Sequence, residues 1–416
     1  MQKEGAERRK IKLSTHQLRP GMYVSRLDRP WLETPFLFQG FRIRDEKQIA
    51  RLQEYCEFVY VDVETSPKLG GTILARGFGA GEGEQKELVP KSRQVLYQDS
   101  IPVEKEITIA ERVHAKAADL VKDIMNELRS GGNLQIPAVQ SVINPMVDSL
   151  IRNPDAFLWL NELKKRDSYT YHRALNSSIL AVLVGRHIGL PKSDLQLLAL
   201  GCLLYDIGKT KIPEELLMKP SRLTPEEFAV VKRHVNLGVD LLRQTPGVDK
   251  QIIFLVRTHH ERHDGSGYPV GLEGFQIPLF GRIAGLVDCY GAITTNRPYA
   301  TALSTTEAIR NIYEWRDIDF QAELVEQFIQ ALGVYPTGSL VELSTGEVAA
   351  VISQNRLRRL RPKVIVILDP EKRHYKRYII VDMVKETRDR NGNSLDIAKG
   401  LPPGSYGINM EELYLS

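Results

Sequence analysis

Five histidine and aspartate side chains in the middle of the chain have the residue types of a transition-metal site. They are Asp206, His234, His259, His260 and Asp288. Imidazole nitrogens and carboxylate oxygens on packed helices are the usual protein ligands of zinc, iron and manganese. A single helical histidine is most often structural. The adjacent pair at 259 and 260 differs because a polar, glycine-containing loop, residues 261–269, follows it directly, as at a metal site formed at a helix end.

Helices must position these side chains, and apolar residues recur at helical spacing from about Val103 to Leu332. Residues 224–227, Thr-Pro-Glu-Glu, combine a threonine N-cap, a proline at the first helical position and the glutamate of a capping box. The following Phe228 is expected to face the core. The predicted fold class is therefore mainly α.

Changes in pattern divide the chain into five predicted parts. Before the helices, a helix over 45–55 and a strand over 58–63 indicate a small α+β domain, and a glycine-rich stretch follows it. After them, strand patterns at 340–343, 348–352, 364–368 and 378–383 indicate a small β-rich segment. The predicted parts are 1–66, a small α+β domain; 67–102, a flexible linker; 103–166, a helical connector; 167–335, the all-helical domain of the candidate site; and 336–416, the β-rich C-terminal segment.

Composition excludes several classes of protein. The 416 residues include 56 Lys and Arg and 52 Asp and Glu, which gives a net charge of +4. This excess of basic residues is smaller than that of most nucleic-acid-binding proteins. The arginine cluster at 356–361 is interpreted as a charged hairpin edge, so no nucleic-acid partner is predicted. Three cysteines without a CxxC pattern argue against a disulfide framework or a zinc–thiolate site. No run reaches the roughly 18 apolar residues of a membrane span, and no signal peptide is visible, so a soluble cytoplasmic protein is expected.

Two segments carry a resemblance to a known family. They are DIGKTKIPEELLMKPSRLTPEEF, which begins at Asp206, and HHERHDGSGYPVGLEGFQIPLFGRIAGLVD, which begins at His259. Together they resemble the HD-GYP family, all-helical metal-dependent phosphodiesterases that hydrolyse the bacterial second messenger cyclic di-GMP. The first sixty-odd residues are similar to a domain of unknown function that often precedes HD-GYP domains. The tail is similar to the small β-rich segment that often follows them.

The resemblance implies a role for each motif residue. The implied ligands of two or three metal ions, iron or manganese, are Asp206, His234, His259, His260 and Asp288. Asp206, the bridging carboxylate, and Lys209, near the phosphate, are the implied catalytic residues. The implied contacts to cyclic di-GMP are Lys209, Gly267, Tyr268, Pro269 and Arg297. The Gly-Tyr-Pro loop is associated in the family with binding diguanylate cyclase domains, so such a domain or another signalling protein is an expected partner. A purely structural loop is the alternative.

The sequence departs from the family pattern at four positions. Tyr205 replaces the histidine of the His-Asp dipeptide, Arg173 falls on an earlier histidine ligand, Gly291 replaces an aspartate, and Ala300 replaces a phosphate-binding lysine. His172 lies one residue early, and one residue rotates a helical side chain by about 100°, so it is expected to point away from the site. Tyrosine, with a reference pKa near 10, is a poor ligand for divalent metals, although a ferric site is not excluded.

Arg173 and Tyr205 fall on positions that serve one metal in the family, together with Asp206 and Asp288. Arginine has five donors and no acceptor, so it cannot bind a metal. We therefore expect its guanidinium to occupy the lost metal position, pairing with Asp288 and with Asp206, and to leave one metal ion rather than two.

Two functions remain open from the sequence. The first is a degenerate HD-GYP domain that binds cyclic di-GMP or a protein partner with little turnover. The alternative is an active phosphodiesterase that yields pGpG or GMP with the remaining ligands. The amphipathic stretch from Val103 to Leu128 is expected either to form a homodimer or to pack within the chain.

Overall fold

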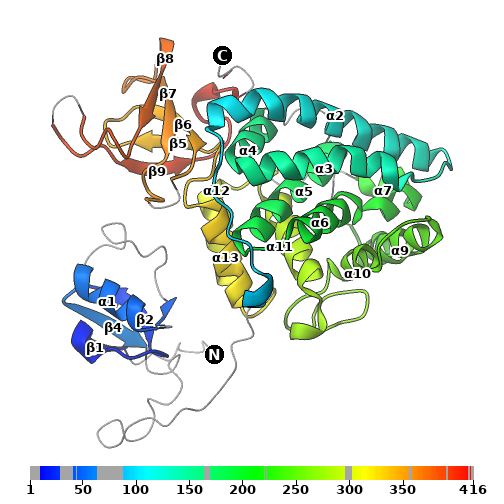
Figure 1. Cartoon of the computed structure of the whole chain (residues 1–416), viewed down its shortest axis with the longest axis horizontal. Helices are drawn as coiled ribbons and strands as arrows, with labels where there is room; N and C mark the ends of the chain where they lie inside the picture. Colours follow the sequence, from blue (N-terminus) through cyan, green and yellow to red (C-terminus); the bar gives the residue numbers. More distant parts are fainter. Residues whose placement is uncertain are drawn as a thin grey trace, which may run out of the picture. The chain divides into compact units, whose positions relative to one another are not determined.

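The computed structural model describes residues 10–28, 41–43, 45–62, 88–163, 169–219, 221, 223–295, 302–355, 358–389, 392–410 and 413. The chain divides into two units, Met1–Gln85 and Lys86–Ser416, each of which is described by itself (Figure 1). The predicted fold class is confirmed: a small α+β part comes first, an all-helical part follows, and a β-sheet ends the chain. The five predicted domain boundaries stay predictions.

In its described residues, the first unit contains a four-stranded antiparallel sheet, one α-helix and a short 3₁₀-helix (Thr15–Gln17). Its elements are β1 (Lys10–Ser14), β2 (Tyr23–Leu27), β3 (Phe41–Arg42), α1 (Glu46–Tyr55) and β4 (Phe58–Asp62), and the strand order is β1-β4-β2-β3. Asp45 caps α1 by accepting a hydrogen bond from the Gln48 N–H. Buried Ile49 and Leu52 of the helix pack on buried residues of the sheet such as Val59. The helix and strand predicted here are confirmed.

The second unit begins with the helices that build the candidate site. They are α2 (Val103–Arg129), α3 (Ile136–Arg152), α4 (Pro154–Leu163), α5 (Tyr169–His187), α6 (Lys192–Leu204), α7 (Glu214–Leu217), α8 (Pro225–Lys232), α9 (His234–Gln244), α10 (Lys250–Thr258), α11 (Leu279–Ile293), α12 (Thr305–Glu314) and α13 (Ala322–Leu332). The long α2 lies across α3 and α4 (Figure 1). Residues of its apolar face, including Ile107, Ala117 and Ile124, are buried within the chain. This agrees with the alternative in which the amphipathic stretch packs within the chain.

Residues 93–97 lie along the connection between α5 and α6, and residues 100 and 101 contact the end of α3. The Val95 N–H donates to the Gly189 carbonyl, and the Tyr97 hydroxyl donates to the Leu190 carbonyl. Asp99 pairs with the buried Arg186 at 2.8 Å. The end of the predicted linker is therefore anchored on the helical part, whereas residues 67–87 lie outside the described residues.

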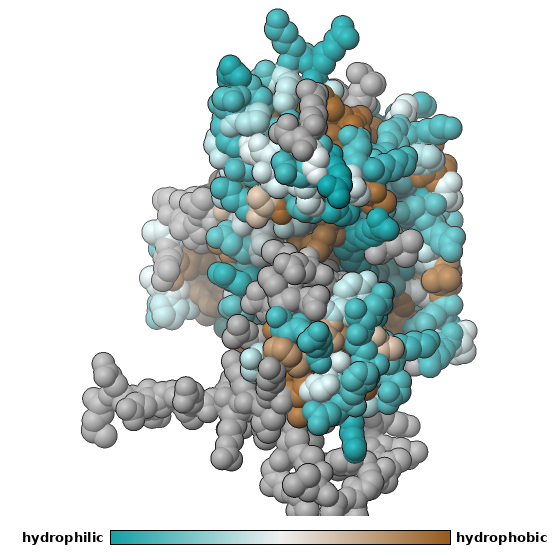
Figure 2. All heavy atoms as spheres, turned by 90° about the vertical axis from the view of Figure 1, so that its left-hand side faces the viewer, coloured by the Kyte–Doolittle hydropathy of each residue, from teal (hydrophilic) through white to brown (hydrophobic). Residues whose placement is uncertain are grey.

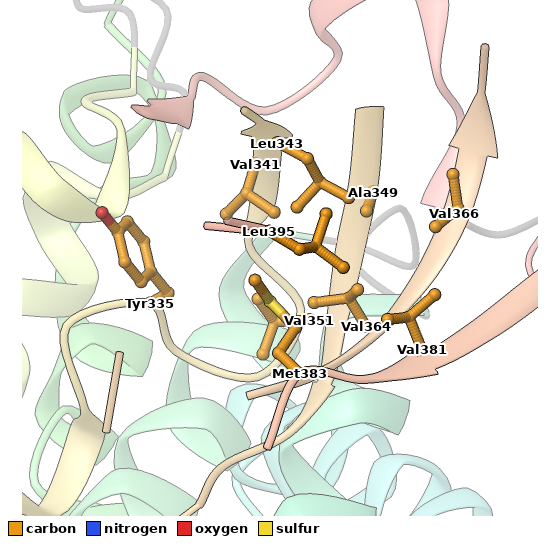
Figure 3. Close-up of a cluster of buried hydrophobic side chains, with 10 residues drawn as sticks. All are labelled: Tyr335, Val341, Leu343, Ala349, Val351, Val364, Val366, Val381, Met383 and Leu395. Atoms are coloured by element: carbon orange, nitrogen blue, oxygen red, sulfur yellow. The ribbon is translucent and has the colours of Figure 1, made fainter. Parts of the chain in front are cut away.

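A five-stranded antiparallel sheet follows the helices. Its strands are β5 (Leu340–Leu343), β6 (Val348–Ser353), β7 (Lys363–Leu368), β8 (His374–Asp382) and β9 (Ile397–Leu401), in the order β8-β7-β6-β5-β9. One face forms a hydrophobic cluster (Figure 3) that includes Val351, Val364 and Met383. The four predicted strands are confirmed. β9 was missed because Ile-Ala-Lys-Gly-Leu is short, partly exposed and without alternation.

Hydrophobic side chains also reach the surface. On the face drawn in Figure 2 they form separate patches among hydrophilic side chains. In the part of the chain that the structure describes, no helix has the length and apolar character to cross a bilayer.

Candidate metal centre

Two glycines allow the ligand-bearing segments to approach one another. Helix α6 ends at Leu204, and Asp206 follows in the turn that leads to the 3₁₀-helix Ile207–Lys211. A Cβ on Gly208 of that 3₁₀-helix would lie 1.9 Å from the His234 carbonyl oxygen, and one on Gly285 of α11 would lie 2.7 Å from the His259 carbonyl oxygen. Real Cβ atoms do not come this close. The glycine of the Asp-Ile-Gly-Lys motif is therefore required for α9 to place His234 beside Asp206.

Four of the predicted ligands converge. One ligand atom from each of Asp206, His234, His259 and His260 lies within 4.8 Å of the others. Nδ1 of His234 lies 2.7 Å from the Val231 carbonyl oxygen, and Nδ1 of His259 lies at the same distance from the Val256 carbonyl oxygen. A ring that donates through Nδ1 presents the lone pair of Nε2. Both Nε2 atoms face Oδ1 of Asp206, at 3.3 and 3.9 Å.

These residues fit a divalent metal ion. Within the described residues, Oδ1 of Asp206, Nε2 of His234 and Nε2 of His259 are buried and have no hydrogen-bond partner. Three buried acceptors that face one another are costly unless a cation satisfies them. Burial lowers the pKa of His259 to about 4 and that of His260 well below its usual value, so both rings are neutral at pH 7. Three imidazoles and a carboxylate suit iron, manganese or zinc.

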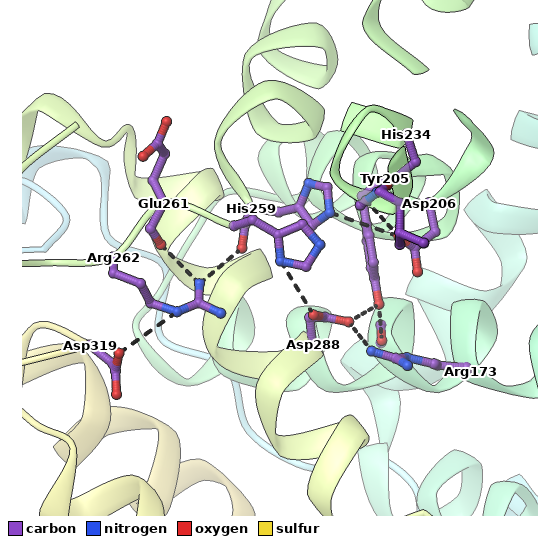
Figure 4. A network of polar contacts seen from close by, with 12 residues as sticks. Arg173, Tyr205, Asp206, His234, His259, Glu261, Arg262, Asp288 and Asp319 are labelled. Carbon is purple, nitrogen blue, oxygen red and sulfur yellow. Dashed lines mark hydrogen bonds and ion pairs between the residues drawn. The ribbon is translucent and has the colours of Figure 1, made fainter. Parts of the chain in front are cut away.

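Asp288, the fifth predicted ligand, is held by an arginine and a tyrosine (Figure 4). Nη2 of Arg173 lies 2.6 Å from Oδ1 of Asp288, and the Tyr205 hydroxyl donates to the same oxygen at 2.9 Å. The Ser177 hydroxyl lies 2.9 Å from the Tyr205 oxygen and donates to it, since the tyrosine hydrogen is already used. The other oxygen of Asp288 lies 4.0 Å from Nδ1 of His260. The predicted ion pair between Arg173 and Asp288 is present.

The predicted contact between Arg173 and Asp206 is not among the described interactions. Oδ2 of Asp206 accepts instead from Nζ of Lys209 at 2.6 Å. Burial alone would raise the pKa of Asp206, but the charge of Lys209, with smaller contributions from His234 and Arg173, holds it well below the usual value. Burial alone would likewise raise the pKa of Asp288, but the charge of Arg173, together with smaller contributions from neighbouring groups, lowers it. Both carboxylates are therefore ionised.

Tyr205 acts as a donor in this structure. Its side chain is fully buried, and burial, together with the charge of Asp288, raises the pKa of its phenol well above 10. The phenol therefore keeps its proton, which points to Asp288. This agrees with the expectation that Tyr205 is a poor ligand for divalent metals.

Glu261 organises the Gly-Tyr-Pro loop. Its buried carboxylate accepts backbone hydrogen bonds from Val270, Gly271 and Leu272 at 2.8, 3.0 and 3.0 Å. Gly267 is needed because a Cβ there would lie 2.4 Å from the backbone nitrogen of Arg262. Sequence reasoning missed Glu261, although a carboxylate directly after paired histidines was the available signal.

Tyr268 joins this loop to the metal position. Its ring stacks on His260, with centroids 4.6 Å apart and planes inclined by 24°. Phe228 meets Tyr268 edge-on at 6.3 Å, and its side chain is 43% exposed. The expectation that Phe228 faces the core is therefore wrong. The short helix α8 lies at the surface, so its apolar face meets the loop rather than the interior.

Three predicted positions lie outside the described residues. Residues 296–300, with Arg297 and Ala300, and the side chain of His172 are not described. Gly291 is described, and a Cβ there would meet only Nδ2 of Asn176, at an ordinary 3.7 Å. Packing therefore does not require glycine at this position.

Known proteins and family models are similar to this chain along most of its length. A family model for a domain of unknown function (DUF3391) matches residues 10–139, an HD domain model matches 158–322, and a KOW domain associated with HD domains matches 340–388. A cyclic di-GMP phosphodiesterase of Pseudomonas aeruginosa is 32% identical over 359 residues, which cover 84% of this chain and 83% of that protein. This chain belongs to the HD-GYP family. The resemblance inferred from the two motif segments is confirmed.

Other relatives match part of the chain. A cyclic di-GMP phosphodiesterase response regulator of Xanthomonas campestris is 35% identical over 169 residues, 40% of this chain and 45% of that protein. A solved HDG"Y"P protein of Bdellovibrio bacteriovorus covers 77% of this chain and 98% of its own, with a TM-score of 0.44 and 14% identity.

Proposed function

We propose that this HD-GYP protein belongs to cyclic di-GMP signalling and has replaced one metal position by a side-chain cation, so that it binds the dinucleotide with little hydrolysis. The observation that carries the proposal is the guanidinium of Arg173, which lies 2.6 Å from the carboxylate of Asp288. The relatives named cyclic di-GMP phosphodiesterases support the substrate class.

In this proposal the guanidinium of Arg173 takes the place of the second metal and neutralises Asp288, and Lys209 pairs with Oδ2 of Asp206. Oδ1 of Asp206 remains directed at His234 and His259. The carboxylate that bridges two ions in the family therefore has one oxygen left for a metal.

One divalent ion, iron or manganese, is the proposed cofactor. Asp206, His234, His259 and His260 would hold it. When bound, such an ion supplies Lewis-acid charge to a phosphate oxygen and lowers the pKa of water. Lys209 would offset phosphate charge beside it. Loss of a second cation removes about 4 kcal/mol of transition-state stabilisation, which corresponds to a rate on the order of a thousandfold lower.

Turnover of cyclic di-GMP tests this function. The full-length protein and the variant carrying Arg173→His with Tyr205→His are loaded anaerobically with iron(II) or manganese(II), and the products are separated by chromatography. We expect pGpG or GMP from the double variant at a rate at least a hundredfold above that of the native protein. The matched control carries Arg257→His and Tyr378→His, both at exposed positions, and is expected to behave as native. Native turnover comparable to that of the double variant would refute the proposal.

The alternative function is an active phosphodiesterase with one metal ion. It is favoured by the convergence of four ligands and by Lys209 beside Asp206. Native turnover that is lost in Asp206→Asn would establish it.

The loop of residues 264–276 is the proposed contact for a diguanylate cyclase domain or another signalling protein. Val270 and Phe275 expose more than half of their side chains there. The cytoplasmic location and the domain boundaries given above remain proposals of the same kind, whereas residues of the apolar face expected to form a homodimer are buried within the chain.

A further inference from the structure

Three side chains form a cluster at the outer edge of the metal centre, termed here the α8 platform: Phe228, Lys232 and Tyr268. Nζ of Lys232 lies 4.8 Å from the centroid of the Phe228 ring and 5.0 Å from that of Tyr268. The opposite end of the cluster reaches the metal ligands, because Tyr268 stacks on His260. A continuous series of rings therefore leads from the proposed metal ligands to the surface of α8.

We propose that the α8 platform is a subsite for one nucleoside phosphate half of a cyclic dinucleotide. In this arrangement a purine stacks on the Phe228 ring, and Lys232 contacts a phosphate oxygen. The proposal rests on the proposed binding of cyclic di-GMP and assigns residues that recognise it.

The exposure of Phe228 supports the stacking role. Phe228 is 43% exposed and so gives up the burial that a core position would provide to its ring. Nucleobases stack on such rings, and every base offers a flat face. In a cyclic dinucleotide a base flanks each phosphodiester. A phosphate at the metal ligands therefore brings a base near the rings that adjoin His260.

Lys232 supplies the complementary charge. Among the described residues it has no carboxylate within ion-pair distance, and its ammonium rests against two ring faces. A phosphate group can draw this ammonium away and so free the rings for a base. The family's second phosphate-binding lysine falls on Ala300 in this sequence. Lys232 provides a cation on another chain segment that offsets this loss.

Calorimetric titration with cyclic di-GMP tests the platform in the full-length, manganese-loaded protein. Phe228→Ala is expected to weaken binding by about 5- to 100-fold, the range for loss of one stacked base, whereas Phe228→Trp retains binding. Lys232→Ala is expected to weaken binding and reduce its salt dependence, and Lys232→Arg to restore both. With inorganic phosphate as the probe, Lys232→Ala weakens binding and Phe228→Ala does not.

Phe254→Ala is the matched control, because Phe254 of α10 is a comparably exposed phenylalanine, at 52%, outside the platform. Its affinity for cyclic di-GMP is expected to stay within twofold of native. Equal affinity of Phe228→Ala and the native protein would overturn the platform, as would a native protein that fails to bind cyclic di-GMP at millimolar concentration. The one-metal proposal is tested by separate measurements. Two metal ions per native chain, or native turnover comparable to that of the double variant, would contradict it, and neither result depends on Phe228.

Discussion

At the scale of single residues, Arg173 forms a largely buried ion pair with Asp288 beside the candidate metal centre. Its side chain is 16% exposed and that of Asp288 is 6% exposed, so the pair is largely shielded from water. Two buried opposite charges stabilise each other mainly by avoiding an unpaired charge. Tyr205 and Ser177 extend the arrangement with one donor each. This position is therefore built as an ion pair with its own hydrogen bonds.

Removal of Arg173 alone is expected to be strongly destabilising. Arg173→Met leaves Asp288 buried without its cation, which costs about 3–5 kcal/mol of unfolding free energy in comparable buried pairs. The measurement is urea denaturation of the metal-free protein. Arg173→Met with Asp288→Asn should recover much of the loss, because the charge is removed with its partner. Arg93→Met is the control, since Arg93 is 60% exposed in its pair with Asp194 and should contribute less than about 1 kcal/mol. If Arg173→Met also lowered the free energy of unfolding by less than about 1 kcal/mol, the Arg173–Asp288 pair would not have the predicted role.

The sequence predicted which side chains converge where a motif contains them, and the roles of these residues stay predictions. The four converging ligands and the pairing of Arg173 with Asp288 followed from positions within the family pattern. Phe228 was misplaced because helical spacing identifies an apolar face without identifying what covers it. Glu261 was missed because its function depends on three backbone N–H groups that fold back over it.

At the scale of elements, the candidate metal centre depends on how closely the backbones of its helices approach one another. Gly208 permits contact between the 3₁₀-helix Ile207–Lys211 and the first residue of α9. A Cβ on Gly291 in α11 would meet no neighbour closer than an ordinary van der Waals contact, so the two glycines differ in what they require. The sequence predicted the helices themselves, whereas this difference depends on distances between segments remote along the chain.

The two glycines give a matched test. Gly208→Ala is expected to displace α9 and abolish tight metal binding, because its Cβ would lie 1.9 Å from the His234 carbonyl oxygen. Gly291→Ala should keep the native metal content. Its free energy of unfolding should rise by up to about 1 kcal/mol, the difference in helix propensity between glycine and alanine. Metal analysis and thermal denaturation measure both effects. Native metal content in Gly208→Ala would show that the approach of α9 is not needed.

Glu261 tests the role of the loop as an element. Glu261→Gln replaces one acceptor oxygen by a donor that faces backbone N–H groups, and loss of a buried charge-assisted hydrogen bond costs about 1–3 kcal/mol. We expect faster hydrogen exchange of the amides of residues 270–272, while those in α2 keep native rates. Glu314→Gln, at an exposed position, should leave both regions unchanged. Unchanged exchange at 270–272 in Glu261→Gln would remove the organising role of this carboxylate.

At the scale of the whole molecule, contacts join the C-terminal sheet to the helices. Buried Asp155 of α4 accepts from the Thr337 hydroxyl at 2.8 Å and from the Gln354 N–H at 3.1 Å. Lys363 of β7 pairs with Glu104 of α2 at 2.7 Å. Local patterns predicted the order of helical and β parts. They could not predict these contacts, because each joins residues separated by 182 to 259 positions.

The number of metal ions bound per chain tests the central claim most directly. The native full-length protein and the variant with Arg173→His and Tyr205→His are loaded anaerobically with iron(II) or manganese(II), freed of excess metal and analysed by mass spectrometry for elements. We predict one ion per native chain and two per variant chain, because the variant frees Asp288 and restores two imidazoles. Two ions in the native protein would show that Arg173 does not occupy a metal position, and would contradict the account.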